Sequence, residues 1–441
     1  MLKAALHNLG CKVNAYETEV MEQLLIENGY EIVDFADKAD VYVINTCSVT
    51  NIADRKSRQM IHQAARRNPD AIIVAAGCYV QTSKEEAEND PDIDIIIGNN
   101  EKNRLVELLR EFEEKRKNDS DSKNAGITGL HDLMHEVTYE QMLLKKSMEH
   151  TRAFIKVQDG CNQFCTYCII PYARGRVRSR TIEDVIEEVK LLVTSGVKEV
   201  VLTGIHVSSY GVDTGSSLIE LIEAISEVDG IERIRLSSLE PRVITDEFVD
   251  RLSKVSKICP HFHLSLQSGS DSVLKRMNRK YDTAEYEKCC ERLRAAFTHP
   301  AITTDIICGF PGETDAEFSE TIEFVKRIKF FETHLFKYSK RKGTVAAGMP
   351  GQITEAVKAE RSHRLSEIQS EYKKEFMSYY IGREEEILVE DTEEIDGETY
   401  YVGLNKEYVR FLIPKSKFTG TVNTFVTVRA RTFLNSDSLC I

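Results

Sequence analysis

Short apolar runs alternate with stretches of helical periodicity over residues 1–115. The apolar runs have the length of buried strands: Lys3–Leu9, Val41–Asn45, Ala71–Ala76 and Ile93–Ile97. The segments between them carry apolar residues at helical spacing: Tyr16–Asn28, Ala53–Arg67 and Asn103–Lys115. Strands that alternate with helices predict a parallel sheet covered on both faces. We therefore expect a small doubly wound α/β domain over residues 1–115.

This pattern is lost over residues 116–148. Glu111–Ser122 is almost entirely charged or polar, and the polar character continues through Lys123–Gly126. A segment of this composition buries too little apolar surface to fold by itself. We predict an exposed linker over residues 116–148.

Strand and helix patterns resume between Thr151 and Ala347. The candidate strands are Ala153–Val157, Glu199–Thr203, Ile234–Ser237, His263–Leu266, Thr303–Ile307 and His334–Tyr338. Helical patterns separate them, for example Thr181–Ser195 and Leu218–Glu227. Successive βα units of this kind predict a partial (β/α) barrel, which we assign to residues 149–375.

The pattern changes to strand-like alternation over residues 376–441. The best candidate strands are Glu386–Val389, Glu398–Leu404, Tyr408–Ile413 and Asn423–Ala430. Several short strands in succession predict a compact all-β barrel. The expected fold class is thus α/β, with a small all-β domain at the C-terminal end.

Composition narrows the choice of protein class. The chain has 441 residues, of which 41% are hydrophobic and 29% charged, as in ordinary globular proteins. No apolar run approaches the roughly 18 residues of a membrane helix, and the first residues do not resemble a signal peptide. We therefore expect a cytoplasmic protein with no membrane contact. The net charge is −13, so a nucleic acid must meet a local basic surface.

Three of the 11 cysteines lie close together, in Cys161-Asn-Gln-Phe-Cys165-Thr-Tyr-Cys168, directly after the first predicted barrel strand. Loops at that end of a strand carry the chemistry in such barrels. Three close thiolates can hold three irons of a cubane cluster and leave the fourth iron open to a ligand. A zinc site needs a fourth protein ligand, and no Cys or His pair follows at short spacing. The motif favours a [4Fe–4S] cluster over zinc or a structural role.

Cys11, Cys47 and Cys78 are far apart in the sequence, but each directly follows one of the first three long predicted strands. In open α/β sheets these strand ends converge on one crevice. The alternative, three unrelated core cysteines, does not explain their identical placement. We expect a second cluster here, and no metal role for the remaining cysteines, Cys259, Cys289, Cys290, Cys308 and Cys440.

The tight cysteine motif, with Tyr167 before its last cysteine, resembles that of the radical S-adenosylmethionine (SAM) enzymes. The resemblance implies that the open iron binds SAM, and that an electron from the reduced cluster cleaves SAM to a 5′-deoxyadenosyl radical. Segments at later strand ends match the superfamily's SAM-binding regions. They supply the expected SAM contacts: Thr203, Gly204, Ser237, Gln267 and Gly309.

The whole chain resembles the methylthiotransferases, which combine an N-terminal cluster domain, a radical SAM barrel and a C-terminal RNA-binding (TRAM-type) β-barrel. The resemblance implies two [4Fe–4S] clusters, SAM as cofactor, and sulfur carried by the N-terminal cluster. Family members modify adenosine-37 of tRNA or an aspartate of a ribosomal protein. Cys47–Gln59 and His334–Thr344 resemble the branch that acts on N6-threonylcarbamoyladenosine (t6A), although Lys337 replaces a proline common in the tRNA enzymes.

Three alternatives stay open beside t6A in tRNA. The substrate can be isopentenyladenosine-37 of tRNA or the ribosomal aspartate, with the same chemistry. The third alternative is a non-catalytic, metal-stabilised RNA-binding protein. The sequence does not identify the sulfur donor, the electron donor or the particular tRNAs.

Arginine recurs at every second position after the cysteine motif, at Arg174, Arg176, Arg178 and Arg180. In an extended segment these side chains share one face, and we expect them to contact RNA. The alternative is ion pairing with the acidic segment Glu183–Glu188. Two further basic sets are candidates for RNA contact. The first is Arg55, Lys56, Arg58, Arg66 and Arg67, and the second is Lys406, Arg410, Lys415, Lys417, Arg429 and Arg431.

Overall fold

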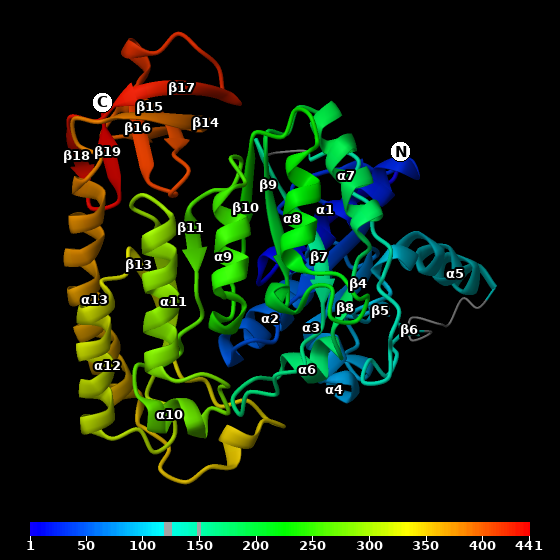
Figure 1. Cartoon of the computed structure of the whole chain (residues 1–441). Helices are drawn as coiled ribbons and strands as arrows, with labels where there is room; N and C mark the ends of the chain where they lie inside the picture. The colour runs from blue at the N-terminus through cyan, green and yellow to red at the C-terminus, as the bar shows by residue number, and fades with distance from the viewer. Residues whose placement is uncertain (119–125, 148–150) are drawn as a thin grey trace.

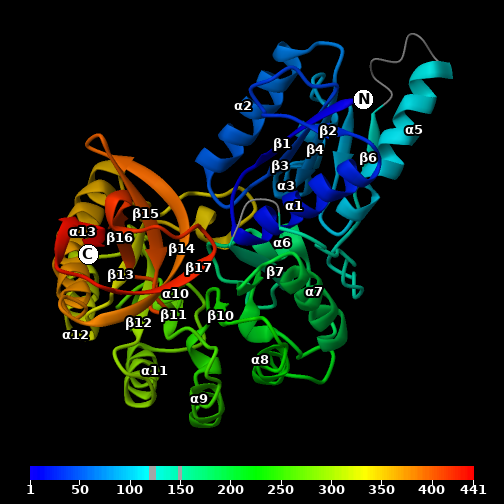
Figure 2. The same cartoon turned by 90° about the horizontal axis from the view of Figure 1, so that it is seen from above.

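A computed structural model describes residues 1–118, 126–147 and 151–441. An N-terminal α/β sheet lies beside a partial (β/α) barrel, and a C-terminal sheet lies on one end of that barrel (Figures 1 and 2). The predicted fold class, α/β with a small C-terminal all-β part, is confirmed. Within the described ranges, no helix is long and apolar enough to cross a membrane.

The N-terminal sheet is parallel throughout, in the order β2-β1-β3-β4-β5-β6. Its strands are β1 (Lys3–Asn8), β2 (Glu31–Ile32), β3 (Val41–Thr46), β4 (Ile72–Gly77), β5 (Ile95–Ile97) and β6 (Ile127–Gly129). Its helices are α1 (Lys12–Glu27), α2 (Asn51–Arg67), α3 (Cys78–Thr82), α4 (Lys84–Glu88) and α5 (Leu105–Asn118). The strand order runs from β1 to β2 on one side and from β3 to β6 on the other, so it reverses between β1 and β3. Doubly wound folds bind their ligands at this kind of position.

Both faces of this sheet are buried, as its apolar strands predict. Val43 and Val74 pack with α1 and α5 on one face. Tyr42 and Ile73 pack with α2 and α3 on the other. Alternate residues of one strand thus serve two separate cores.

The segment predicted as an exposed linker is packed where the structure describes it. Its strand β6 pairs with β5 and extends the N-terminal sheet. Tyr139, Met142 and Leu144 are buried, and the Tyr16 hydroxyl donates to the Met142 carbonyl (3.0 Å). The prediction of exposure is therefore wrong at the buried positions of residues 126–147, because scattered apolar residues pack on other elements, whereas positions such as Val137 are exposed. Residues 119–125 and 148–150 lie outside the described residues.

The barrel strands run parallel in chain order, apart from one short antiparallel strand. They are β7 (Arg152–Asp159), β9 (Glu199–Gly204), β10 (Arg233–Leu236), β11 (His261–His263), β12 (Ala301–Cys308) and β13 (Glu332–Lys337), with β8 (Arg178–Ser179) antiparallel to β7. The β10-β9-β7-β8 and β11-β12-β13 sheets meet through parallel bridges Ile234–Ile258 and Leu239–Leu264. This is the predicted partial barrel.

The helices of the barrel cover its outer face. They are α6 (Ile170–Arg174), α7 (Ile182–Thr194), α8 (Leu218–Ser226), α9 (Asp246–Ser253), α10 (Asp271–Arg276), α11 (Thr283–Ala296), α12 (Asp315–Ile328) and α13 (Glu355–Ser378). Side chains of Thr181, Ser217 and Thr245 cap α7, α8 and α9. The sequence pattern did not predict α13, whose buried positions include charged Lys358 and Arg361.

The C-terminal sheet has the order β17-β14-β15-β16-β19-β18 and is antiparallel except between β16 and β19. Its strands are β14 (Glu384–Ile395), β15 (Glu398–Leu404), β16 (Arg410–Pro414), β17 (Thr424–Arg429), β18 (Thr432–Asn435) and β19 (Ser438–Cys440). Arg233 donates to the carbonyls of Leu404 and Glu386 (both 2.8 Å). Since Arg233 begins β10, this sheet lies at the N-terminal ends of the barrel strands.

Candidate functional site

The three dispersed cysteines lie at neighbouring strand ends of the N-terminal sheet. Cys11 follows β1 and caps α1, Cys47 follows β3, and Cys78 follows β4 as the first residue of α3. Since β1, β3 and β4 are adjacent and parallel, their thiols share one edge. Cys11 and Cys47 flank the β1–β3 reversal. The structure thus places this N-terminal trio where the sequence analysis expected it.

A glycine and two asparagine side chains fix the geometry of this edge. Gly10 has a φ of +109°, and a Cβ there would lie 2.8 Å from the Cys47 sulfur, so the Cys11 loop passes close to Cys47. The Asn14 amide donates to the carbonyls of Leu9 (2.7 Å) and Thr46 (2.9 Å), which ties the ends of β1 and β3 together. The Asn99 amide lies 3.6 Å from the Cys78 sulfur, in hydrogen-bonding orientation.

A buried ion cluster joins this edge to the barrel. Glu17 of α1 pairs with Lys102 (2.9 Å), with Lys156 of β7 (2.8 Å) and with Arg174 (2.5 Å). All four side chains are fully buried. Burial alone would raise the pKa of Glu17, but the cations, Arg174 foremost, outweigh it and hold that pKa well below the usual value. The N-terminal sheet and the barrel therefore share one buried charged core.

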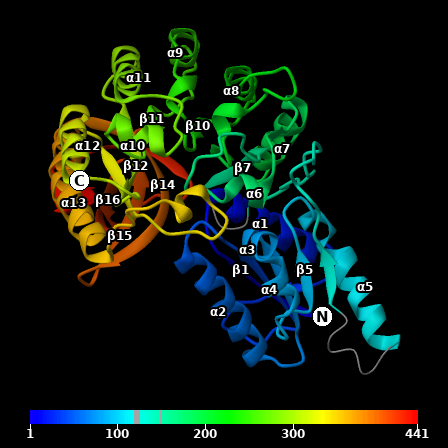
Figure 3. The same cartoon turned by 90° about the horizontal axis from the view of Figure 1, so that it is seen from below.

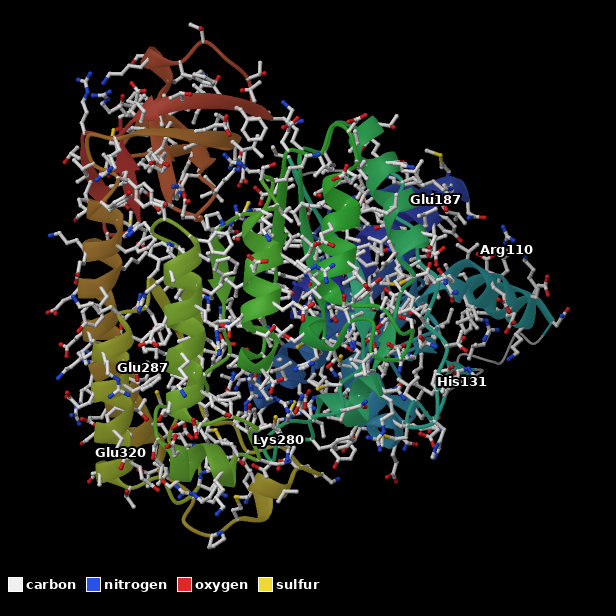
Figure 4. All side chains as sticks on the ribbon, in the orientation of Figure 1. Arg110, His131, Glu187, Lys280, Glu287 and Glu320 are labelled. Carbon is white, nitrogen blue, oxygen red and sulfur yellow. The ribbon has the colours of Figure 1, made fainter. Side chains whose placement is uncertain are left out.

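The tight cysteine motif forms the loop after β7, at the opposite end of the barrel from the C-terminal sheet. Thr166 N donates to the Met277 carbonyl (3.0 Å), which anchors the loop to the end of α10. Arg279 Nη1 donates to the Cys165 sulfur (3.3 Å), and Gln163 N to the Cys161 sulfur (3.5 Å). Lys280, next to Arg279, marks this end of the barrel in Figure 4.

Burial affects the protonation of three of these cysteines. It raises the pKa of Cys47 to about 12, of Cys161 to about 11 and of Cys168 to about 12. These groups are neutral thiols at pH 7, so they become thiolates when a metal replaces the proton. Donors already aimed at Cys78, Cys161 and Cys165 then stabilise the charge on sulfur. Both trios fit iron–sulfur clusters.

The expected SAM contacts lie at barrel strand ends on the side of the cysteine loop. Thr203 and Gly204 end β9, and Ser237 follows β10. The Ser237 hydroxyl and the His206 Nε2 atom are buried without a hydrogen-bond partner among the described residues. Buried polar atoms without partners are costly, and a polar cofactor such as SAM would satisfy them.

Gln267 and Gly309 occupy the next strand ends. Gln267 has a φ of +71° and forms a parallel bridge with Ile306. A Cβ at Gly309 would lie 2.4 Å from Lys358 Cγ, so the packing of α13 by itself requires glycine there. The expected adenine contact at Gly309 stays a prediction.

A cavity of about 210 Å³ lies where the barrel's cysteine loop meets the segment that follows Cys47. The barrel contributes Cys168, Gln267, Asp305 and Phe336 to its wall. The N-terminal sheet contributes Val49 and Thr50, which closely follow Cys47. Most of the wall is apolar, so the cavity offers a largely apolar surface beside Cys168.

Arg341 fastens the two sides of this cavity together. Its guanidinium donates to Asp54 (2.7 Å), Asn51 (2.8 Å) and Ser48 (3.2 Å), all from the end of β3 and the start of α2. The Ser48 hydroxyl bonds in turn with Thr82 (2.8 Å) in the helix that Cys78 begins. Figure 3 shows the loop after β13 lying against the start of α2.

The arginine segment predicted to contact RNA does not form one exposed face. Arg174, Arg178 and Arg180 are buried. Arg174 pairs with Glu17, and Arg180 pairs with Glu188 (2.7 Å) on α7, the ion-pair alternative considered above. Arg176 is exposed, and its guanidinium lies over the Phe164 ring (4.6 Å). The RNA-contact prediction is therefore wrong for Arg174, Arg178 and Arg180, because α6 and β8 turn these side chains inward.

Sequence reasoning missed Glu17, Arg279 and Arg341. Each acts through partners more than 100 residues away, so no local motif marks it. For Arg341 a signal did exist. Its segment and the Cys47–Gln59 segment are the two that resemble the t6A branch, and the structure brings them into contact.

Comparison with known proteins agrees with this geometry. The radical SAM superfamily matches residues 155–325, and "Uncharacterized protein family UPF0004" matches residues 3–98. The threonylcarbamoyladenosine tRNA methylthiotransferase MtaB of Bacillus subtilis (strain 168) is 45% identical over 413 residues, covering 93% of this chain and 90% of the relative. The chain belongs to the radical SAM methylthiotransferase family. The family uses SAM and [4Fe–4S] clusters.

Other methylthiotransferases are also similar. MtaB of Aquifex aeolicus (strain VF5) is 41% identical over 399 residues, covering 90% of this chain and 95% of the relative. The tRNA-2-methylthio-N(6)-dimethylallyladenosine synthase of Thermoanaerobacter sp. (strain X514) is 38% identical over 389 residues, covering 86% and 80%. Among solved structures, the radical SAM methyltransferase TsrM of Kitasatospora setae has a TM-score of 0.55 at 15% identity, covering 76% of this chain and 75% of that one, which shows a shared fold.

Proposed function

We propose that the protein is a tRNA methylthiotransferase that converts t6A at position 37 to its 2-methylthio derivative. The similar MtaB proteins, at up to 45% identity, support this substrate over dimethylallyladenosine, whose enzymes reach 38%. A tRNA substrate also implies a cytoplasmic location. We propose residues 1–115 as the cluster domain, 149–375 as the radical SAM core and 376–441 as a TRAM-type RNA-binding domain.

The observation that supports the proposal is a cavity lined both by a cysteine of the barrel trio and by the segment that follows Cys47. Cys168 lines it from the barrel, while Val49 and Thr50 place the Cys47 edge at its opposite wall. A reaction that activates a carbon and then adds sulfur to it needs both groups to reach the same atom. Walls contributed by both segments support a reaction in which the two groups reach one substrate atom.

Each trio has a proposed role in holding a cofactor. Cys161, Cys165 and Cys168 would hold one [4Fe–4S] cluster, with SAM beside Thr203, Gly204, Ser237 and Gln267. Cys11, Cys47 and Cys78 would hold the other. When bound, these groups supply the radical chemistry at the substrate carbon, the sulfur and the methyl group.

The protein's own residues would exclude water, receive the base and position the substrate. The apolar wall of the cavity keeps water away from the reacting atoms. Phe336 offers an exposed aromatic face beside the cavity for an extruded base. Arg341 holds the Cys47 edge against the barrel and so fixes how far a substrate atom lies from each trio.

Mass spectrometry of tRNA nucleosides tests the proposal directly. Cells lacking the protein should accumulate t6A and lose 2-methylthio-t6A, and the wild-type gene should restore it. The purified enzyme, reconstituted anaerobically, should act on tRNA with t6A and not on matched tRNA with isopentenyladenosine. Activity on the second tRNA alone would assign the protein to the isopentenyl branch.

The same material separates the remaining alternatives. A ribosomal substrate predicts unchanged tRNA nucleosides and a missing modification on a ribosomal protein. A non-catalytic RNA-binding protein predicts bound zinc, no SAM cleavage and no visible iron–sulfur absorbance. Iron and sulfide quantitation therefore excludes or establishes that last alternative.

A further inference from the structure

Four exposed cations lie in two segments that continue from lining residues of the cavity, one in the N-terminal domain and one in the barrel. Arg55 and Lys56 belong to the first turns of α2, and Lys340 and Lys342 to the loop after β13. We call these four residues the basic rim. No ion pair links any of them to another residue in the described ranges of the chain. In a protein of net charge −13, four cations without ion-pair partners create a local positive electrostatic potential.

The two halves of the basic rim are held in a fixed relation. Asn51 N donates to the Ser339 hydroxyl (3.2 Å), and the Asn51 amide donates to the Lys340 carbonyl (3.0 Å). Arg341 pairs with Asp54, so the nearest carboxylate of α2 is already neutralised. The two segments that carry the four cations are therefore in direct contact where the N-terminal sheet meets the barrel.

Exposed apolar side chains lie within the same two segments. Val49 and Ile52 at the start of α2 are 50% and 59% exposed, and Phe336 at the end of β13 is 48% exposed. Val49 and Phe336 also line the cavity. Cations around an exposed aromatic ring are the features that bind unpaired nucleotides, since phosphates meet the charges and a base stacks on the ring.

We propose that the basic rim binds the phosphates of an RNA loop, and that Phe336 receives a base extruded from it toward the cavity. This inference rests on the proposed tRNA substrate and replaces the buried arginine segment as the RNA contact. The outer barrel helices fit RNA less well, because they present acidic side chains such as Glu187, Glu287 and Glu320 (Figure 4). In the C-terminal sheet, which the proposed function also assigns to RNA binding, Arg429 pairs with Glu384 (2.9 Å).

The test measures affinity for a fluorescent tRNA anticodon stem–loop as a function of salt, with the full-length reconstituted protein. The variants are Arg55→Ala/Lys56→Ala, Lys340→Ala/Lys342→Ala, and the two combined. Each pair should flatten the slope of log Kd against log salt by roughly 1.5 units, if each cation neutralises one phosphate. Phe336→Ala should leave that slope unchanged but lower methylthiolation.

Matched controls make the result specific. Lys190→Ala/Lys288→Ala removes two exposed cations from the outer barrel helices and should leave the slope unchanged. Lys415→Ala/Lys417→Ala tests the C-terminal sheet. An unchanged slope in the rim variants, or equal flattening in the Lys190/Lys288 control, would overturn the inference. If the wild-type protein binds the stem–loop no better than single-stranded DNA of equal length, the tRNA substrate itself is wrong.

Discussion

At the scale of single residues, Arg279 links the barrel packing to the cysteine loop. Its guanidinium is partly buried, stacks on Tyr281 (4.8 Å to the ring centroid) and donates to Cys165. A cation that donates to a thiolate stabilises the more negative, reduced form of a cluster. With a cluster bound, Arg279 would therefore make it easier to reduce, and reduction of the cluster must precede SAM cleavage.

Arg279→Ala should retain iron but lower the midpoint potential of the barrel cluster. We expect SAM cleavage to slow by about 10-fold or more, the usual size of an effect next to a metal ligand. Potentiometric titration followed by electron paramagnetic resonance checks this. Arg279→Lys keeps the charge and should lie between the variant and wild type. An unchanged potential in Arg279→Ala would contradict this role.

Glu407, in the loop between β15 and β16, gives a prediction for pH. Burial, helped by nearby Glu385, raises its pKa to about 7. Between its ordinary pKa of 4.5 and about 7, the folded protein binds more protons than the unfolded one, so stability falls as pH rises through this range. Glu407→Gln removes the effect and should stabilise the protein by about 1–2 kcal/mol at pH 8, with little change at pH 4.5.

Thermal unfolding at the two pH values measures this effect. Glu394→Gln, on the exposed part of β14, is the matched control and should show no such difference. Equal melting temperatures for Glu407→Gln and wild type at pH 8 would contradict the prediction.

Sequence alone predicted residues whose role depends on local context. The cysteines were placed correctly at strand ends because apolar runs define those strands and the cysteines directly follow them. The arginines after Cys168 were placed incorrectly, because their environment depends on partners that are distant in the sequence. Arg174 is buried in an ion pair with Glu17, which lies 157 residues earlier in the chain. An alternating pattern in a short segment does not reveal such a partner.

At the scale of elements, Arg341 and the start of α2 act as one unit. The loop after β13 reaches the N-terminal sheet through this side chain, next to Cys47. Arg341→Ala should leave SAM cleavage near wild type, because the barrel trio is not involved. Methylthiolation should fall roughly 100-fold, the size of effect that a misplacement of about 1 Å produces.

The ratio of 5′-deoxyadenosine to 2-methylthio product measures this uncoupling. Arg341→Lys can keep the ion pair with Asp54 and should restore part of the coupling. A general loss of stability would lower both products together and leave their ratio unchanged. That outcome would mean that Arg341 has only a structural role.

The elements differ in how well the sequence predicts them. β15 was predicted to the residue, and the long buried strands to within a few residues, since continuous apolar runs define them. α13 was missed because ion pairs such as Arg361–Glu313 (2.7 Å) replace part of its apolar face. β6 was missed because three residues carry too little pattern to distinguish a strand from a loop.

At the scale of the whole molecule, the two trios divide the chemistry. Replacing Cys161, Cys165 and Cys168 with Ala should halve the iron, from about eight to about four atoms per chain, and abolish SAM cleavage. Replacing Cys11, Cys47 and Cys78 should also halve the iron but preserve SAM cleavage and stop methylthiolation. Iron analysis and product assays check both, with Cys289→Ser, in the buried face of α11, as the control that retains both clusters.

Full iron content in either triple variant would mean that the ligands are misassigned. Loss of SAM cleavage in the variant of the N-terminal trio, with the barrel cluster intact, would instead reject the division of labour between the trios.

The buried ion cluster around Glu17 also bears on how the chain is made. Glu17 leaves the ribosome long before Arg174, and Ser48 precedes Arg341 by 293 residues. At roughly 5–20 residues per second, synthesis needs about 15–60 s to supply that last partner. Until then the Cys47 edge lacks Arg341, the side chain that ties it to the barrel. We therefore expect Cys47 and Cys78, which are buried in the finished chain, to be most accessible to a cluster-delivering protein during translation.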